Sequence, residues 1–260
     1  YQGVIDWDTT AQYIDFAIIR CGRGSDLTAQ DDTKWAVNTA ACERLGIPYG
    51  VYLYSLAQTD EEARSEAAHA LRLLDGKHPQ LPVYLDLEDS GIRDNCTKAE
   101  VLRHATIFCE TLQAAGYSVG VYANRYWWTT TLDDPAYDRW DRWLAVWAAE
   151  TGYSGSYSTW QNSNSGRIPG IQANVDLDLR YGASLRADHT HDYRITEHVA
   201  LTCTDFGQNV YTCGGCGASV TQPLRPLGGE HVWDGGTVVQ QASCAGDGVR
   251  RYTCTRCGTT

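Results

Sequence analysis

The sequence of 260 residues contains no methionine, and it has only three phenylalanines and seven prolines. Without methionine, Tyr1 is not a natural start, so we expect the chain to be a fragment or a processed form. No signal peptide is recognisable, and no apolar run approaches the roughly 20 residues that a membrane-spanning helix needs. The sequence therefore predicts no transmembrane segment.

Basic residues are scarce relative to acidic ones. The chain has 21 Lys and Arg against 32 Asp and Glu, a formal net charge of −11 and a pI of about 5.0. Nucleic-acid binding needs a basic surface, and anionic membranes attract basic segments. We therefore predict no nucleic-acid partner and no electrostatic attraction to a membrane.

Hydrogen-bonding aromatic residues, by contrast, are plentiful. The chain has nine Trp and sixteen Tyr, and 43% of its residues are hydrophobic, which is typical of a globular protein. Rings that are apolar yet can hydrogen-bond suit a sugar-binding cleft, whereas a tyrosine-rich core would give the same composition. Both interpretations remain open at this point.

Up to about Gly182, short β-like runs alternate with helical segments, which is typical of a parallel α/β sheet. Capping boxes predict helix starts at Thr59, with Glu62, and at Thr97, with Glu100. Gly46 and Gly116 are natural helix ends. Strand, helix and strand recur without hairpin signals, so length and strand count favour a barrel over an open sheet. The predicted strands are 15–20, 49–55, 83–88, 118–123 and 143–147, with shorter pieces near Trp160 and Val175.

Beyond Gly182 the helical pattern disappears, and a repeat rich in Cys, Gly and Thr follows. HDYRITEHVALTCTDFGQNVYTCGGCG (191–217) matches HVWDGGTVVQQASCAGDGVRRYTCTRCG (231–258) in the order and spacing of its cysteines. The sequence thus predicts an α/β barrel domain over 1–183, a linker over 184–190, and two Cys/His repeats over 191–228 and 229–260.

Each repeat supplies one His and three Cys, enough for a tetrahedral zinc site with a Cys-x-x-Cys-Gly knuckle. A module of about 40 residues has too little core to fold alone, so a structural metal is physically motivated. Disulfides are the alternative, although three cysteines pair badly within one unit. His189 or His198 could replace His191, and His231 could serve the preceding repeat. The predicted ligand sets are His191, Cys203, Cys213, Cys216 and His231, Cys244, Cys254, Cys257.

The stretch LPVYLDLEDS (81–90) places two acids, Asp86 and Glu88, at the end of an apolar strand. Residues i and i+2 of a strand share a face, so Tyr84, Asp86 and Glu88 are expected on one side. The Cα atoms of two such residues are about 6.6 Å apart. Once the side chains turn, this is close to the carboxyl separations of both retaining and inverting glycoside hydrolases. Solvated acids at a strand end are the plain alternative.

Several segments in succession give the chain a specific resemblance to the glycoside hydrolase family 25 lysozymes, which cleave peptidoglycan between N-acetylmuramic acid and N-acetylglucosamine. They occur in the family's order and span nearly the whole predicted barrel. The matching segments are YQGVIDW (1–7), FAIIRCGRG (16–24), GIPYGVYLYS (46–55) with the following EEA helix, LPVYLDLED (81–89), GYSVGVYAN (116–124), WLAVW (143–147), STWQNSNSGRIPGI (158–171) and NVDLDL (174–179).

The resemblance implies a modified TIM-like (β/α) barrel whose last strands lack helices. It implies that Glu88 is the general acid, that Asp86 is the neighbouring carboxylate, and that Asp176 points into the cleft from the final strand. The family's first strand, with another Asp, lies upstream of Tyr1, so we expect it to be missing from this chain. The aromatic candidates for sugar contact could equally be core residues. The candidates are Tyr52, Tyr54, Tyr84, Tyr122, Asn124, Trp147 and Gln161.

Together these observations predict an exported bacterial muramidase, secreted or at the cell surface, that acts as a monomer on peptidoglycan. Catalysis is expected to need no cofactor, and zinc is expected in the C-terminal repeats. One alternative is a catalytically impaired wall-binding protein. Another is a different barrel glycosidase, such as a chitinase.

Overall fold

The structure is a computed structural model that describes residues 3–183, 190–191, 193–215, 217, 219–224, 227, 229–244 and 246–260. The chain divides into two compact units, Tyr1–His191 and Asp192–Thr260. Most of the predicted linker, 184–189, lies outside the described residues.

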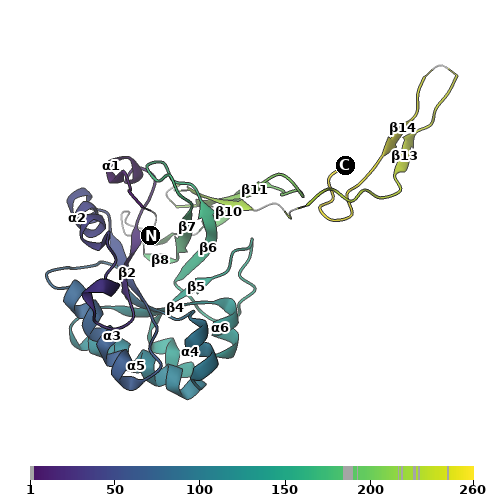
Figure 1. Ribbon diagram of the computed structural model, residues 1–260. Coiled ribbons are helices and arrows are strands. Elements are labelled where there is room, and N and C mark those ends of the chain that lie inside the picture. The colour runs from purple at the N-terminus through teal and green to yellow at the C-terminus, as the bar shows by residue number, and fades with distance from the viewer. Residues whose placement is uncertain are drawn as a thin grey trace. The chain divides into compact units, whose positions relative to one another are not determined.

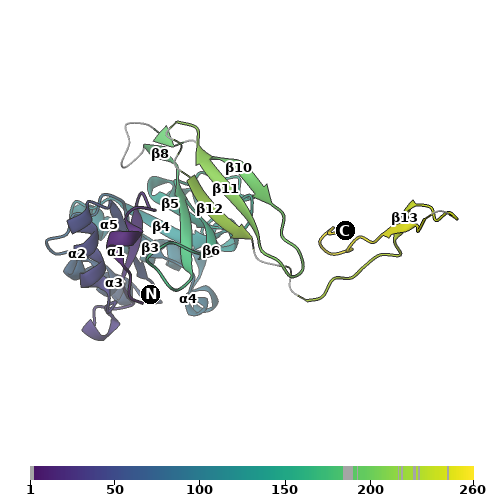
Figure 2. The same ribbon diagram turned by 90° about the horizontal axis from the view of Figure 1, so that it is seen from above.

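The first unit is built on one curled sheet of seven strands in sequence order (Figures 1 and 2). Strands β1 to β6 run parallel to their neighbours, and β7 runs antiparallel to β6. This is the modified TIM-like fold predicted from the sequence. The strands are β1 (Ala17–Arg23), β2 (Tyr49–Tyr54), β3 (Val83–Asp86), β4 (Val119–Asn124), β5 (Asp141–Ala145), β6 (Thr159–Gly166) and β7 (Val175–Arg180).

Helices connect the strands up to β5 and pack on the outside of the sheet (Figure 1). No helix is found between β5 and β7 in the described chain, as the resemblance implied. Two short antiparallel strands, β8 (Gly182–Ala183) and β9 (Thr190–His191), form the last part of the first unit. The helices are α1 (Trp7–Thr10), α2 (Trp35–Leu45), α3 (Asp60–Leu73), α4 (Ser90–Asn95), α5 (Lys98–Ala114) and α6 (Arg125–Thr130), with 3-10 turns η1 (Thr28–Gln30) and η2 (Pro135–Arg139).

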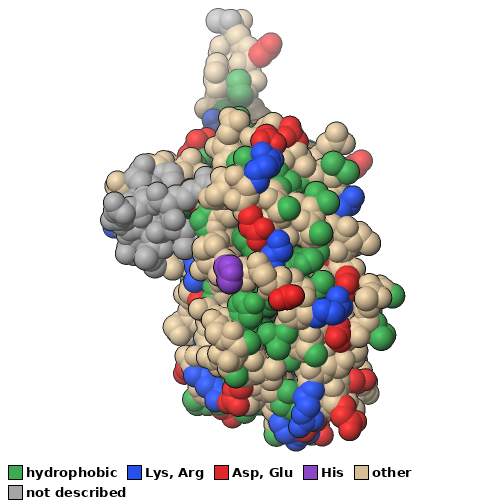
Figure 3. Space-filling view, turned by 90° about the vertical axis from the view of Figure 1, so that its left-hand side faces the viewer, with side chains coloured by type: hydrophobic (Ala, Val, Ile, Leu, Met, Phe, Trp, Pro, Cys, Tyr) green, Lys and Arg blue, Asp and Glu red, His purple; other side chains and the backbone are tan. Residues whose placement is uncertain are grey.

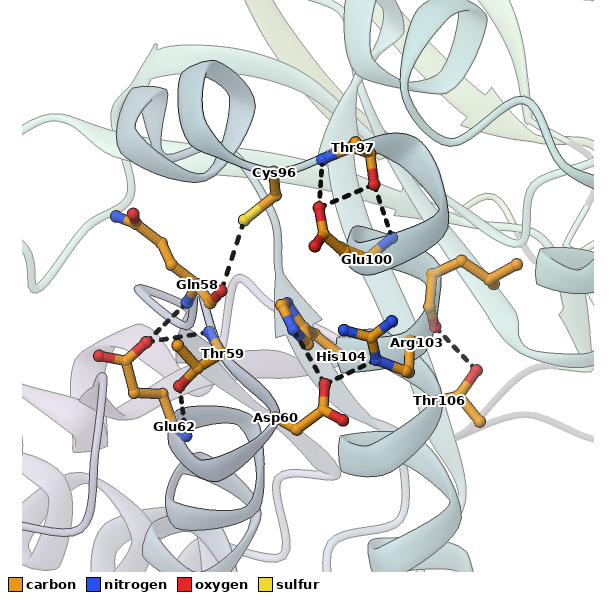
Figure 4. Close-up of polar contacts among 11 residues, drawn as sticks. Gln58, Thr59, Asp60, Glu62, Cys96, Thr97, Glu100, Arg103, His104 and Thr106 are labelled. Atoms are coloured by element: carbon orange, nitrogen blue, oxygen red, sulfur yellow. Dashed lines mark hydrogen bonds and ion pairs between the residues drawn. The ribbon is translucent and has the colours of Figure 1, made fainter.

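Both predicted capping boxes are present (Figure 4). The Thr59 hydroxyl accepts from the Glu62 backbone N–H at 3.2 Å, and the Glu62 carboxylate accepts from the Thr59 N–H at 3.1 Å. Thr97 and Glu100 make the same pair of bonds at 3.3 and 2.8 Å. These bonds satisfy backbone donors that have no partner inside the helix, so α3 and α5 start where the sequence predicts.

The alternation of side chains along β3 separates two packing layers. Val83, Leu85 and Leu87 are buried in the large core that the sheet shares with the helices. Tyr84 faces the other side, in a smaller cluster with Tyr122, Trp143 and Ala145. The inner face of the sheet is therefore aromatic and polar, whereas most strand residues that face the helices are aliphatic.

The second unit is entirely β in its described residues. A three-stranded antiparallel sheet is followed by a separate hairpin. The strands are β10 (Tyr193–Val199), β11 (Gly207–Cys213) and β12 (Ser219–Leu224), then β13 (Thr237–Gln240) and β14 (Val249–Arg251).

None of the helices within the described part of the chain is long and apolar enough to cross a membrane. On the face shown in Figure 3, lysine and arginine side chains are dispersed among acidic and apolar ones. This distribution agrees with the acidic composition and differs from the clustered basic surface of nucleic-acid-binding proteins.

Candidate active site

One row of residues crosses the sheet near the carboxyl ends of its parallel strands. Asp86, the last residue of β3, pairs with Tyr54 on β2 and with Tyr122 on β4, and Tyr122 pairs with Trp143 on β5. Active sites of (β/α) barrels gather at this end because the loops that follow the strands meet there. Asp86 therefore lies where such a site is expected.

The Asp86 carboxyl is buried, with 4% of the residue exposed. Its Oδ1 atom has no hydrogen-bond partner among the described residues. Burial and then the charge of Glu88 hold the pKa of Asp86 well above its usual range, and Arg20 acts in the opposite direction. Without a hydrogen bond to stabilise the anion, the environment favours the protonated carboxyl.

Glu88 follows β3 in the loop, because the strand ends at Asp86 and not at Glu88 as predicted. Its side chain is exposed, yet the surrounding protein limits solvation of the carboxyl and raises its pKa, with a further contribution from Asp176. Asp176, exposed on β7, also has a raised pKa because of desolvation. The three predicted catalytic carboxyls therefore interact electrostatically, and each holds its proton to higher pH than a free carboxyl.

Sequence reasoning missed two residues on the inner face, Asp178 and Trp143. The Trp143 indole N–H donates to Asp178 Oδ1 at 2.7 Å. Burial raises the pKa of Asp178 to about 7, although this hydrogen bond favours the anion. The alternation in NVDLDL could have identified Asp178, because it lies two residues from Asp176 and thus on the same face. Trp143 carries no comparable local signal.

Trp143 also organises the aromatic cluster of the inner face. Its ring centroid lies 4.5 Å from that of Tyr122, 5.1 Å from that of Tyr84 and 5.9 Å from that of Tyr52. Tilted and edge contacts at these separations are favourable between aromatic rings. The cluster forms an apolar wall beside the acids.

Trp147 is the most exposed of the predicted sugar-contacting rings, with 58% of the residue accessible. Its indole N–H donates to Gln161 Oε1 at 3.0 Å, and the Tyr122 hydroxyl donates to the same oxygen at 3.1 Å. Gln161 is itself buried. This shared acceptor fixes the Trp147 ring while leaving its surface open to a ligand.

Tyr52 and Tyr54 are half-buried on β2. The Tyr54 hydroxyl donates to Asp89 Oδ2 at 3.3 Å, in the loop that carries Glu88. Both tyrosines therefore keep some surface for a ligand beside the acids.

Tyr84 and Asn124, in contrast, have structural partners. Tyr84 is fully buried, and its hydroxyl donates to Asp141 at 2.9 Å and accepts from Arg180 at 3.0 Å. The side-chain Oδ1 atom of Asn124 accepts a hydrogen bond from the Trp127 backbone N–H at 3.1 Å and caps α6. Tyr84 therefore has no exposed surface that could contact a sugar, and the side-chain oxygen of Asn124 already accepts a hydrogen bond from the backbone.

In the second unit the structure groups the predicted metal ligands differently from the sequence-based sets. Cys244 is exposed and lies outside the group, and Cys213 is buried elsewhere in the unit. Cys216 and the side chain of His191 lie outside the described residues. The ligand atoms within 4.8 Å of one another belong to Cys203, His231, Cys254 and Cys257.

The first 171 residues match the family model described as glycosyl hydrolases family 25. The chain therefore belongs to glycosyl hydrolase family 25. No curated protein sequence matches it significantly.

Several solved structures share the fold of the chain. The modular autolysin LytC from Streptococcus pneumoniae, solved with a synthetic peptidoglycan ligand, is 27% identical with a TM-score of 0.63, and the match covers 69% of this chain and 44% of LytC. The bacterial lysozyme from Streptomyces coelicolor is 21% identical, with a TM-score of 0.59 and coverage of 71% and 90%. A family 25 glycosyl hydrolase from Bacillus anthracis is 24% identical, with a TM-score of 0.60 and coverage of 70% and 85%. The chain thus spans less than half the length of LytC.

Proposed function

We propose that this protein is a peptidoglycan hydrolase that cleaves the β-1,4 bond between N-acetylmuramic acid and N-acetylglucosamine. The observation that carries the proposal is the group of interacting carboxyls with raised pKa, Asp86, Glu88 and Asp176, beside an aromatic wall. Membership of family 25 and the similarity to an autolysin solved with a peptidoglycan ligand support this substrate.

In the proposed mechanism Glu88 donates a proton to the glycosidic oxygen as the bond breaks. A general acid must carry its proton at working pH, and the raised pKa of Glu88 favours this. Its exposure gives the carboxyl access to a bound glycan, whereas Asp86 lies deeper.

Asp86 is proposed as the neighbouring carboxylate that stabilises the positive charge developing on the sugar. The free protein favours the protonated form of Asp86, and the positive charge that develops on the bound sugar favours the anion, with the proton released to solvent. Asp176 is proposed to face the same region from β7 and to raise the pKa of Glu88 by its charge.

Replacing Asp176 with Asn is expected to shift the alkaline limb of the pH–rate profile to lower pH. The charge of Asp176 raises the pKa of Glu88, so removing it lets Glu88 lose its proton at lower pH. The measurement is kcat/KM on soluble peptidoglycan fragments as a function of pH. An alkaline limb that stays in place, or moves to higher pH, would contradict this coupling.

Replacing Trp147 with Ala is expected to raise KM about tenfold, equivalent to about 1.4 kcal/mol, with little change in kcat. The ring offers an exposed face for a sugar but no group that takes part in proton transfer. Tyr13→Ala removes an equally exposed ring from the segment after α1 and serves as the control. Equal KM values for Trp147→Ala and Tyr13→Ala would remove Trp147 from the binding surface.

A substrate comparison tests the proposed function. Purified peptidoglycan and chitin oligosaccharides are incubated with the protein, and new reducing ends are counted. The proposal expects release from peptidoglycan and little from chitin. Preferential cleavage of chitin would indicate a chitinase, and peptidoglycan binding without cleavage of either substrate would indicate a wall-binding protein.

We further propose that the protein acts outside the cell, secreted or at the surface, as a monomer whose catalysis needs no cofactor. The proposed organisation is a catalytic domain over 1–183, a linker over 184–190, and repeats over 191–228 and 229–260 that use zinc as a structural ion. The similarity to the autolysin LytC, which was solved with a peptidoglycan ligand, supports action on the cell wall.

A further inference from the structure

The second unit brings together three thiols and an imidazole from both repeats. The Sγ atoms of Cys203 and Cys254 are 3.7 Å apart, and Cys257 Sγ is 3.4 Å from His231 Nδ1. A tetrahedral ion with zinc–sulfur bonds of about 2.3 Å holds two sulfurs about 3.8 Å apart and a sulfur and an imidazole nitrogen about 3.6 Å apart. Both observed distances are close to these values, and all four ligand atoms lie within 4.8 Å of one another.

Strand register explains why the first cysteine of a repeat does not join the knuckle of its own repeat. In the first repeat Cys213 pairs with Tyr193 at one end of the β10–β11 hairpin, while Cys203 lies in the loop beyond the Val199–Gln208 pair. At about 3.4 Å per residue, Cys213 lies about 17 Å along β11 from Gln208, too far to share an ion with Cys203.

The second repeat is built in the same way. Cys244 lies in the loop between β13 and β14. Cys254 follows β14, and its backbone forms an isolated antiparallel β-bridge with Trp233, which precedes β13. His231 therefore approaches Cys254 and Cys257 from the base of the hairpin, and Cys244 lies at its other end. The Sγ atom of Cys203, from the first repeat, lies within 4.8 Å of these three side chains.

The knuckle has the backbone shape that a pair of metal thiolates needs. The Gly258 N–H donates to the Cys254 carbonyl at 2.9 Å, and Gly258 has a φ of +77°, which a side chain would disfavour. The first repeat has the same turn: the Gly217 N–H donates to the Cys213 carbonyl at 2.9 Å, and Gly217 has a φ of +75°. The Cys-x-x-Cys-Gly sequence thus dictates a tight turn in both repeats.

The described part of the second unit has little apolar core of its own. Its buried apolar residues are Tyr211 and three cysteines, and two of these cysteines, Cys203 and Cys254, belong to the group of four. A unit of this size without a core depends on a cross-link such as a metal ion. Large apolar side chains such as Phe206, Trp233 and Tyr252 stay exposed.

We propose that Cys203, His231, Cys254 and Cys257 bind one Zn²⁺ ion, and that this ion joins the second repeat to the first. The first cysteine of one repeat completes the site of the next. Three thiolates and one imidazole form a closed structural site, with no position left for a catalytic water. The proposal does not depend on the activity of the first unit.

Cysteine footprinting on the full 260-residue chain tests the proposal without any substitution. The reduced protein is alkylated with iodoacetamide in the presence of Zn²⁺ or of a chelator, and each cysteine is quantified by mass spectrometry. We expect Zn²⁺ to slow alkylation of Cys203, Cys254 and Cys257 at least about tenfold and to leave Cys244 unchanged. Protection of Cys244 in place of Cys203, or no protection by Zn²⁺, would overturn the proposal.

Three matched variants separate a ligand from a buried thiol. Cys203→Ser is expected to abolish the Zn²⁺ protection of Cys254 and Cys257. Cys244→Ser, in the sequence-predicted ligand set, should retain that protection. Cys213→Ser replaces an equally buried cysteine of the first repeat and should retain it as well. Loss of protection in all three variants, or retention in Cys203→Ser, would contradict a specific role for Cys203.

Discussion

Replacing Glu88 with Gln is expected to lower kcat on peptidoglycan about 10³-fold, because general acid catalysis contributes about 10² to 10⁴ in rate. Gln keeps the size and hydrogen-bonding shape of the side chain but has no acidic proton to give to the leaving oxygen. Binding of peptidoglycan should change little, because the lost interaction forms in the transition state. The measurements are the initial rate of reducing-end release and a cosedimentation assay on purified peptidoglycan.

Glu61→Gln is the matched control. Glu61 is an exposed glutamate in the first turn of α3, so its replacement makes the same chemical change on the outer helical layer. Glu61→Gln should retain the wild-type rate. Wild-type activity in Glu88→Gln would show that another group donates the proton.

The second large effect is expected for Asp86→Asn, which should lower kcat about 10²- to 10³-fold through loss of electrostatic stabilisation. The substitution keeps the shape of a buried side chain and removes its ability to become an anion. Peptidoglycan cleavage at wild-type rate by Asp86→Asn would exclude Asp86 as the stabilising carboxylate.

The same variant is expected to be more stable than the wild type at pH 7. Burial raises the pKa of Asp86 in the folded protein above its ordinary value of 3.8. The unfolded chain therefore releases this proton first as pH rises, and the wild type loses stability between pH 3.8 and the raised folded pKa. Asn does not titrate, so the variant avoids this loss, and its advantage should vanish as pH falls toward about 4.

Thermal unfolding at a series of pH values measures this difference. Asp75→Asn, which removes an exposed carboxyl after α3, should leave the unfolding temperature close to that of the wild type. An Asp86→Asn variant that is less stable than the wild type at pH 7 would show that the buried anion is stabilised by its surroundings. Gained stability together with lost activity would indicate that burial of Asp86 serves function.

Local signals predicted much of the barrel. The alternation in LPVYLDLEDS predicted that the strand has two different faces, and the structure places Val83, Leu85 and Leu87 in the core with the helices and Tyr84 in the cluster on the opposite face. The capping box at Thr59 fixed the start of α3, because its hydrogen bonds lie within a few residues. Such features depend on short-range geometry, which a sequence displays directly.

Features that depend on neighbouring strands were harder to predict. The hydroxyl of Tyr84, on β3, forms its hydrogen bonds with Asp141 on β5 and Arg180 on β7. The contact of Trp143 with Asp178 likewise joins two strands that are not adjacent in the sheet. No single segment carries the information that sets these contacts.

The repeats illustrate the same limit. Aligning the two copies matched each cysteine to its counterpart and favoured ligand sets within one repeat. The structure instead groups Cys203 with His231, Cys254 and Cys257, because a hairpin separates the first cysteine from its own knuckle. Sequence spacing could not reveal this, since it does not show where each hairpin turns.

The most direct test of the central claim is the identity of the sugar at the newly formed reducing end. Purified peptidoglycan is digested, the products are reduced with borohydride, and the reduced sugar is identified by mass spectrometry. The proposed activity predicts reduced N-acetylmuramic acid from the wild type and almost none from Glu88→Gln. Reduced N-acetylglucosamine as the main product, or equal release by both proteins, would contradict the proposed muramidase.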